Sequence, residues 1–246
     1  MNIYWSVCSA AYNPIIDLEY NLIPFINFED PESLFSKLTQ MNLNISDKLG
    51  DFRYCPAFKK QVKNTFVLKS PIDYNLSLDR EKDSVSSNMY DQDFFNKVVH
   101  VRSGIDAHCS LNIMYLFVSE ESLSIQLTGA YFSDNDFVNK TMIIPGSFDI
   151  GKWCRPVECA FIAKKEFNEI SINRGDDYSY IQFDTDKDLN FKKFIFSDKM
   201  KKMLAENSQS RSYNKKKFKP LEYWYDLFHN SKQKRIIMKE IKDNLI

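Results

Sequence analysis

Three residues near the middle of the chain have the types and spacing of metal ligands. His100, Asp106 and His108 lie in the segment "HVRSGIDAHC". Two imidazoles and a carboxylate are a common ligand set for iron or zinc, as in cupin-like metal centres. The spacing lacks the closely paired histidines of those centres, and the third histidine, His229, lies far along the chain. Two interpretations therefore stay open: a metal site, or ordinary histidines in or beside strands.

A second segment could hold a ligand beside an aromatic ring. Lys152, Trp153 and Arg155 lie in "GKWCRPVEC", and a cation next to an indole can contact a bound group. The same side chains could equally cover an edge of the core. Cys154 and Cys159 lie in this segment without the second close pair that a zinc site needs, so we expect reduced thiols there.

The most suggestive stretch is the basic and aromatic "YNKKKFKPLEYWYDLFHN". Four lysines precede a tryptophan in it: Lys215, Lys216, Lys217, Lys219 and Trp224. Positive charge for phosphates and rings for stacking are what the binding of single-stranded nucleic acid requires. The pattern also fits a solvated basic linker before an amphipathic helix whose rings pack on the body. The net charge of +0 for the whole chain favours this second interpretation.

Other motifs for catalysis or cofactor binding are missing from the sequence. It contains no Walker A motif, no GxGxxG and no HExxH, so the parts of nucleotide-binding and zinc-protease sites are lacking. The chain has only 6 glycines, which leaves little material for glycine-rich phosphate loops. We therefore predict no cofactor, and a binding protein is favoured over an enzyme.

The region that must position most of these residues is predicted to be rich in β-strands. Between residues 97 and 196, branched and aromatic side chains fill the strand-length runs "KVVHVRS", "SLNIMYLFVS", "SLSIQLT", "TMIIP", "ECAFIAK", "NEISIN", "YSYIQFDT" and "NFKKFIF". The segments "SEES" and "RGDD" predict hairpin turns, and the polar residues 79–93 predict a loop. The pattern predicts an α+β fold with an antiparallel β-rich core, either a sandwich or an open barrel, including jelly-roll and cupin-like arrangements.

Helices are predicted near the N-terminal end of this core. Asp30 and Pro31 predict the N-cap and the first position of a helix over residues 30–42. In "CPAFKKQVKNTFVLKSPIDYNL", Pro56 is expected to begin one helical turn. Pro71 then separates two strands in the same stretch.

The C-terminal residues 197–246 are predicted to form two or three helices on a body made of residues 1–196. This extension has 13 Lys+Arg and 6 Asp+Glu, whereas the body has the opposite imbalance. Ile237, Ile241 and Leu245 are spaced four apart, which predicts an apolar stripe along a helix. We expect the extension to pack on the core or on a neighbouring subunit.

The N-terminal segment "MNIYWSVCSAAYNP" has neither the basic region nor the continuous apolar run of a signal peptide. No apolar stretch is long enough to span a bilayer. Together with 5 widely spaced cysteines, these features predict a soluble protein of a reducing cytoplasm with no membrane partner.

Two segments, "RYCPAFKKQVKNTFVLKSPIDYNL" and "MIIPGSFDIGKWCRPVECAF", resemble uncharacterised proteins of marine tailed bacteriophages, especially T4-like ones. The resemblance implies a phage-encoded protein in the host cytoplasm or in the virion, and it carries over no activity or catalytic residue. The leading hypothesis is a non-enzymatic binding or assembly protein that contacts a protein partner or itself. The alternatives are a small metal-dependent enzyme on a cupin-like barrel and a protein that binds single-stranded nucleic acid through the basic tail.

Overall fold

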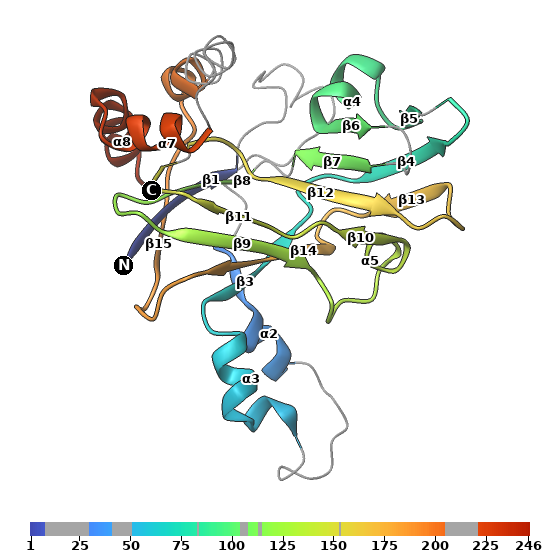
Figure 1. The fold of residues 1–246 in the computed structure, drawn as a ribbon, viewed down its shortest axis with the longest axis horizontal. Helices are drawn as coiled ribbons and strands as arrows, with labels where there is room; N and C mark the ends of the chain where they lie inside the picture. The colour runs from blue at the N-terminus through green and yellow to red at the C-terminus, as the bar shows by residue number, and fades with distance from the viewer. Residues whose placement is uncertain are drawn as a thin grey trace.

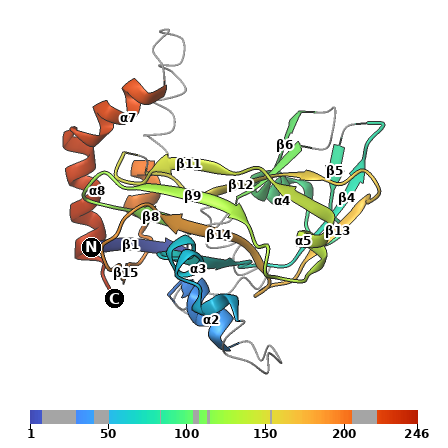
Figure 2. The same ribbon diagram turned by 60° about the horizontal axis from the view of Figure 1, so that its bottom comes forward.

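The computed structural model describes residues 1–7, 30–40, 51–82, 84–103, 108–112, 115–152, 154–204 and 221–246. These residues form a mixed α/β fold that is mostly β, with strands in the centre and helices at the periphery (Figure 1, Figure 2). The described strands pair into four open sheets and form no closed barrel. No described helix is long and apolar enough to span a membrane.

A three-stranded sheet lies between the main core and the C-terminal helices. Its order is β15 (Asn190–Lys193), β1 (Asn2–Val7) and β8 (Tyr115–Val118). β1 is antiparallel to β8 but parallel to β15, which differs from the expected antiparallel core. Because successive side chains of a strand point to opposite faces, Trp5 lies in the main core and Tyr4 lies with the C-terminal helices.

Three further sheets, all antiparallel, surround the main core. The five-stranded sheet consists of β11 (Gly146–Asp149), β9 (Ser124–Gly129), β14 (Asp177–Phe183), β3 (Thr65–Lys69) and β2 (Glu32–Ser33), in this order. The four-stranded sheet consists of β10 (Thr141–Ile143), β12 (Glu158–Ala163), β7 (His108–Asn112) and β6 (Val99–Ser103). The remaining sheet consists of β13 (Glu169–Ile172), β4 (Tyr74–Asp79) and β5 (Ser84–Ser86).

The inner faces of the sheets share one hydrophobic core. Two short helices add side chains to it: α4 (Gln92–Val98), capped by Asp91, contributes Phe94 and Phe95, and α5 (Asp136–Lys140), capped by Asn135, contributes Phe137. Other fully buried aromatic side chains of this core are Trp5, Phe117, Phe161, Tyr178 and Phe183. Each large apolar side chain buried in this way contributes roughly 1.5–3 kcal/mol to stability.

A smaller apolar cluster covers the outer face of the five-stranded sheet. α2 (Leu34–Gln40) and α3 (Pro56–Gln61) lie there, at the bottom of Figure 1. Leu34 and Leu38 of α2 pack in one cluster with Val67 of β3 and Tyr180 of β14. The adjacent residue of β3, Leu68, points into the main core, as strand alternation requires.

The C-terminal helices pack on the three-stranded sheet. α7 (Leu221–His229) and α8 (Lys232–Asp243) lie near both ends of the chain (Figure 1, Figure 2). Ile237 and Ile241 are buried against Tyr4, Leu116, Val118 and Phe194, which confirms the predicted apolar stripe at these two positions. The third predicted member, Leu245, is exposed. The helices therefore dock on this chain's own strands.

The helix predicted over residues 30–42 begins later than expected. Asp30 is not its N-cap, because its carboxylate accepts a 2.7 Å hydrogen bond from Trp5 Nε1. Residues Glu32–Ser33 pair with β3 as β2, and the helix then runs from Leu34 to Gln40. A tertiary hydrogen bond and a strand pairing thus replace the local capping pattern.

The two predicted hairpins are also wrong. "SEES" connects β8 to β9 and "RGDD" connects β13 to β14, and in both cases the two strands belong to different sheets. The loop predicted over residues 79–93 contains β5 and the start of α4. The run "SLNIMYLFVS" contains parts of two strands, β7 and β8, from different sheets.

The predictions for the stretch from Cys55 to Leu76 are confirmed. α3 begins at Pro56, and Asn64 follows it with a left-handed φ of 53°, which reverses the chain before β3. β3 and β4 flank Pro71, as expected for a residue that cannot donate to a strand ladder.

Cys55 should be the most reactive of the described thiols. It is exposed at the N-cap of α3, and the backbone N–H groups of Phe58 and Ala57 lower its pKa. Cys109, Cys154 and Cys159 are buried, and burial raises the pKa of Cys159 to about 12. Because the thiolate is the nucleophile, Cys55 should react with a disulfide reagent at neutral pH while the three buried thiols do not.

This reactivity is measured best in a Cys8→Ser background, since residue 8 lies outside the described residues. One equivalent of thiol per chain should react. Its rate should level off with rising pH below the ordinary cysteine pKa of about 8.5. A Cys55→Ser variant serves as the control and should lose this equivalent. A reaction that persists in this variant would contradict the assignment.

Candidate functional site

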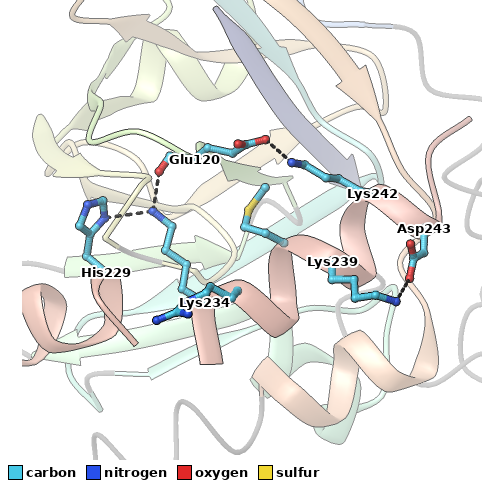
Figure 3. Close-up of a pocket in the computed structure, with 8 residues that line it drawn as sticks. Glu120, His229, Lys234, Lys239, Lys242 and Asp243 are labelled. Atoms are coloured by element: carbon cyan, nitrogen blue, oxygen red, sulfur yellow. Dashed lines mark hydrogen bonds and ion pairs between the residues drawn. The ribbon is translucent and has the colours of Figure 1, made fainter. Parts of the chain in front are cut away.

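The charged face of α8 forms the clearest candidate site. The helix begins at its N-cap Ser231, whose side chain accepts a 3.1 Å hydrogen bond from the backbone N–H of Lys234. Its apolar residues face the sheet, and charged residues fill much of the rest of its surface. Between α8 and the loop after β8 lies a pocket of about 500 Å³, which we call the basic pocket (Figure 3). Its lining residues are Glu120, His229, Lys234, Arg235, Met238, Lys239, Lys242 and Asp243.

Lys234 is the buried cation of the basic pocket. Only 6% of the residue is exposed, and burial lowers the pKa of its ammonium group. Nζ lies 2.8 Å from the backbone carbonyl oxygen of Glu120 and 3.0 Å from Nδ1 of His229 (Figure 3). An ammonium group has three protons to donate, and these contacts engage at most two of them. Among the described residues no third partner is found, so the remaining donor is available to a group that enters the pocket.

His229 connects the basic pocket to a tight turn after β11. Its Nδ1 lies 3.0 Å from the carbonyl oxygen of Gly151 and also 3.0 Å from Lys234 Nζ. A single ring nitrogen either donates to the carbonyl or accepts from the ammonium group, so the two contacts exclude each other. Gly151 is required at this turn, because a Cβ atom there would overlap the backbone carbonyl of Glu121.

Glu120 is held in place by two partners. Its carboxylate forms an ion pair of 2.7 Å with Lys242, and its Oε1 accepts a 2.7 Å hydrogen bond from the Tyr4 hydroxyl. The Lys242 ammonium and the Tyr4 hydroxyl together lower the pKa of Glu120. Burial and the same carboxylate raise the pKa of Tyr4. Glu120 is thus ionised at neutral pH, with Oε1 engaged by both partners.

The lining of the basic pocket has an excess of positive charge. Four of its residues are cationic, namely Lys234, Arg235, Lys239 and Lys242, and two are anionic, namely Glu120 and Asp243. Both carboxylates already form ion pairs, with Lys242 and Lys239. Arg235 is exposed and has no ion-pair partner among the described residues. The arrangement can therefore hold an anionic group between Arg235 and Lys234.

The two predicted metal-ligand histidines lie on neighbouring strands, β6 and β7. His100 is exposed and pairs with Ser110, which is two residues from His108 on the same face of the sheet. Asp106 lies outside the described residues. Within the described ranges, no group of three His, Cys, Asp or Glu side chains could hold a metal ion. The metal site stays a prediction, with two of its three residues on one face.

The other predicted site residues are described only in part. Lys152 forms an ion pair of 2.6 Å with Asp226 of α7, and Arg155 is exposed. Trp153, between them, lies outside the described residues. Lys215, Lys216, Lys217 and Lys219 also lie outside them, as does the side chain of Trp224, whose backbone belongs to α7. The predicted ligand site and the predicted nucleic-acid site therefore stay predictions.

Sequence reasoning missed the basic pocket. One signal was present: Arg235, Lys239 and Lys242 recur at helical spacing next to the apolar stripe of Ile237 and Ile241. This pattern is ordinary for a solvated helix face. The pocket forms because Glu120, which is distant in the sequence, and His229 of α7 lie next to this face of α8.

No protein-family model matches this chain, and no curated protein sequence matches it. Its function is therefore inferred from the chemistry of its own residues.

Proposed function

We propose that the protein is a non-enzymatic, phage-encoded binding or assembly protein that holds an anionic partner in the basic pocket. One observation supports this most directly: Lys234 is buried in the pocket wall with an ammonium donor left over. Burying a cation is costly unless it is fully hydrogen-bonded, and an anionic partner would complete its contacts. Arg235 supplies a second donor at the rim.

The partner is a protein surface that combines acidic and apolar side chains. The helical pair that forms the pocket also exposes Tyr223, Leu227 and Ile236. Nucleic acid would use the cations of this surface but not the aliphatic side chains. The chain would act in the host cytoplasm or in the virion, in keeping with the phage-like segments.

Reversing the charges of Arg235 and Lys239, the rim charges of the basic pocket, should weaken this binding. The probe is a labelled peptide of alternating glutamate and leucine, followed by fluorescence anisotropy at several salt concentrations. The double variant Arg235→Glu/Lys239→Glu should lose about tenfold in affinity, since each rim charge contributes on the order of 1 kcal/mol. The affinity of the wild-type protein should also fall with added salt.

A matched control is Lys192→Glu/Lys202→Glu, which reverses two exposed lysines outside the pocket lining. It changes the net charge equally and should leave peptide affinity nearly unchanged. Equal losses in the two double variants would mean that only overall charge matters, against the proposal. The wild-type protein could instead bind oligo(dT) tightly and not the peptide, and lose this binding in Arg235→Glu/Lys239→Glu. This result would mean that the partner of the basic pocket is nucleic acid and not protein.

The cupin-like enzyme stays the alternative to this proposal, because His100 and His108 share one face of their sheet. Metal analysis of the purified protein distinguishes the two. One equivalent of iron or zinc that disappears in His100→Ala and His108→Ala would favour the enzyme.

A further inference from the structure

A group of aromatic rings beside α3 forms a surface that the basic pocket does not use. We define this aromatic platform as Phe52, Tyr54, Phe58, Tyr131 and Phe132. Its rings come from the 3-10 helix η2 (Phe52–Tyr54), from α3, and from the loop between β9 and α5. α3 lies on the outer face of the five-stranded sheet, at the opposite end of Figure 1 from α7 and α8.

The rings of Phe52, Phe58, Tyr131 and Phe132 contact one another, Tyr54 lies two residues from Phe52, and three of the five rings are exposed. Phe52 lies 4.8 Å from Phe58 and 6.0 Å from Phe132 between ring centroids, and Tyr131 lies 4.9 Å from Phe132. The exposed fractions are 37% for Phe52, 55% for Tyr54 and 57% for Tyr131. Gathered aromatic rings with free faces are uncommon on a protein surface and mark interaction sites.

Partly buried polar contacts hold the segments that carry the aromatic platform. Asp51 accepts hydrogen bonds from the backbone N–H and the Nε of Arg53, at 2.9 and 2.6 Å, and Arg53 donates to the carbonyl oxygen of Leu38 at 3.1 Å. On the other side, Asp177 accepts from the Ser133 hydroxyl at 2.6 Å. Rings fixed in this way lose little conformational entropy on binding a ligand.

The charge beside Tyr54 is positive. The Lys59 ammonium lies 5.6 Å from the ring centroid of Tyr54 and 6.0 Å from that of Phe35. Lys59 and Lys60 have no ion-pair partner among the described residues, and α3 contains no acidic residue. The two buried acids nearby, Asp51 and Asp177, form ion pairs with Arg53 and Lys37. The α3 side of this surface therefore complements an anionic ligand, whereas the exposed Asp134, in the loop that holds Tyr131, adds one negative charge.

We infer that the aromatic platform binds a short stretch of single-stranded nucleic acid, with bases stacked on Tyr54 and Tyr131 and a phosphate near Lys59. Flat rings with adjacent cations are what sequence-tolerant binding of single strands requires. The inference is independent of the proposed function, because no residue of the basic pocket takes part.

The test is binding of labelled oligo(dT) to the full chain, followed by fluorescence anisotropy over a range of salt concentrations. The double variant Tyr54→Ala/Tyr131→Ala should lose affinity about tenfold or more, since each stacked base contributes strongly. Tyr54→Phe/Tyr131→Phe keeps both rings and should bind like the wild type. Met142→Ala removes an equally exposed apolar side chain, 53% exposed, from β10 and should also bind normally.

The salt dependence provides a second readout. The slope of log affinity against log salt concentration should lie between about −0.7 and −1.4, as expected for one or two phosphates on a single strand. Replacing Lys59 by alanine should flatten this slope.

Three results would overturn the inference: no binding of oligo(dT) at low salt, equal binding by wild type and Tyr54→Ala/Tyr131→Ala, or loss of binding only in Arg235→Glu/Lys239→Glu. Binding of the glutamate–leucine peptide instead of oligo(dT), lost with the tyrosine variants, would assign the aromatic platform to a protein partner and would also overturn it. The two results that concern the tyrosine variants do not depend on whether the basic pocket binds its own partner.

Discussion

Replacing Trp5 with alanine should lower the free energy of unfolding by about 3–5 kcal/mol, the loss typical of a large aromatic side chain removed from a core. Trp5 is fully buried in β1, and its ring stacks on Tyr115 with centroids 6.2 Å apart. Its Nε1 donates to Asp30, and the Lys193 ammonium lies 5.2 Å from the centroid of its ring. The substitution removes all three contacts and leaves a cavity in the core. Urea unfolding followed by far-UV circular dichroism measures the effect.

Trp5→Phe is the matched control for this prediction. It keeps an aromatic ring in the core but removes the donor to Asp30, so the loss should be clearly smaller. Equal losses in the two variants would mean that the hydrogen bond dominates rather than ring burial. A loss below about 1 kcal/mol for Trp5→Ala would show that the core around β1 relaxes to fill the cavity.

Sequence patterns predicted correctly those elements that depend on residues close together in the sequence. Pro56 begins α3 and Pro71 separates β3 from β4, because proline restricts its own backbone and that of the preceding residue wherever it lies. Ile237 and Ile241 are buried as their spacing indicates, because a helix places residues four apart on one face.

Features that depend on distant residues were not predictable in this way. Asp30 has the sequence context of an N-cap, but it bonds to Trp5, 25 residues away. "SEES" and "RGDD" have turn chemistry, yet the strands that they join pair elsewhere, since pairing is decided by which faces can be buried together. The basic pocket depends on a contact between Lys234 and Glu120, which are 114 residues apart.

The aromatic platform could not be predicted from the sequence either. Its rings come from two segments, Phe52–Phe58 and Tyr131–Phe132, whose sequences carry no shared pattern. Buried aromatic side chains are abundant elsewhere in this chain, so composition alone cannot separate exposed rings from core rings. Only the position of α3 on the outer face of the sheet separates them.

Replacing Ile237 with alanine should destabilise the docked α8 by about 2–5 kcal/mol, whereas Lys239→Ala should cost no more than about 1 kcal/mol. Ile237 is fully buried in one cluster with Tyr4, Leu116 and Val118, so its loss leaves a cavity between the helix and the three-stranded sheet. Among the described residues, Lys239 forms an ion pair only with Asp243 on the same helix, and both side chains are largely exposed.

The comparison tests whether apolar packing or charge holds the C-terminal helices. The extension and the body have opposite net charges, so attraction favours docking, but exposed pairs are screened by salt and contribute little individually. Stability should therefore fall sharply for Ile237→Ala and should depend only weakly on salt concentration in the wild-type protein. Because α8 supplies Lys234 and Lys242 to the basic pocket, Ile237→Ala should also weaken binding of the glutamate–leucine peptide. Equal stability losses for Ile237→Ala and Lys239→Ala, or a strong salt dependence, would instead mean that ion pairs such as Lys242–Glu120 hold the helix in place.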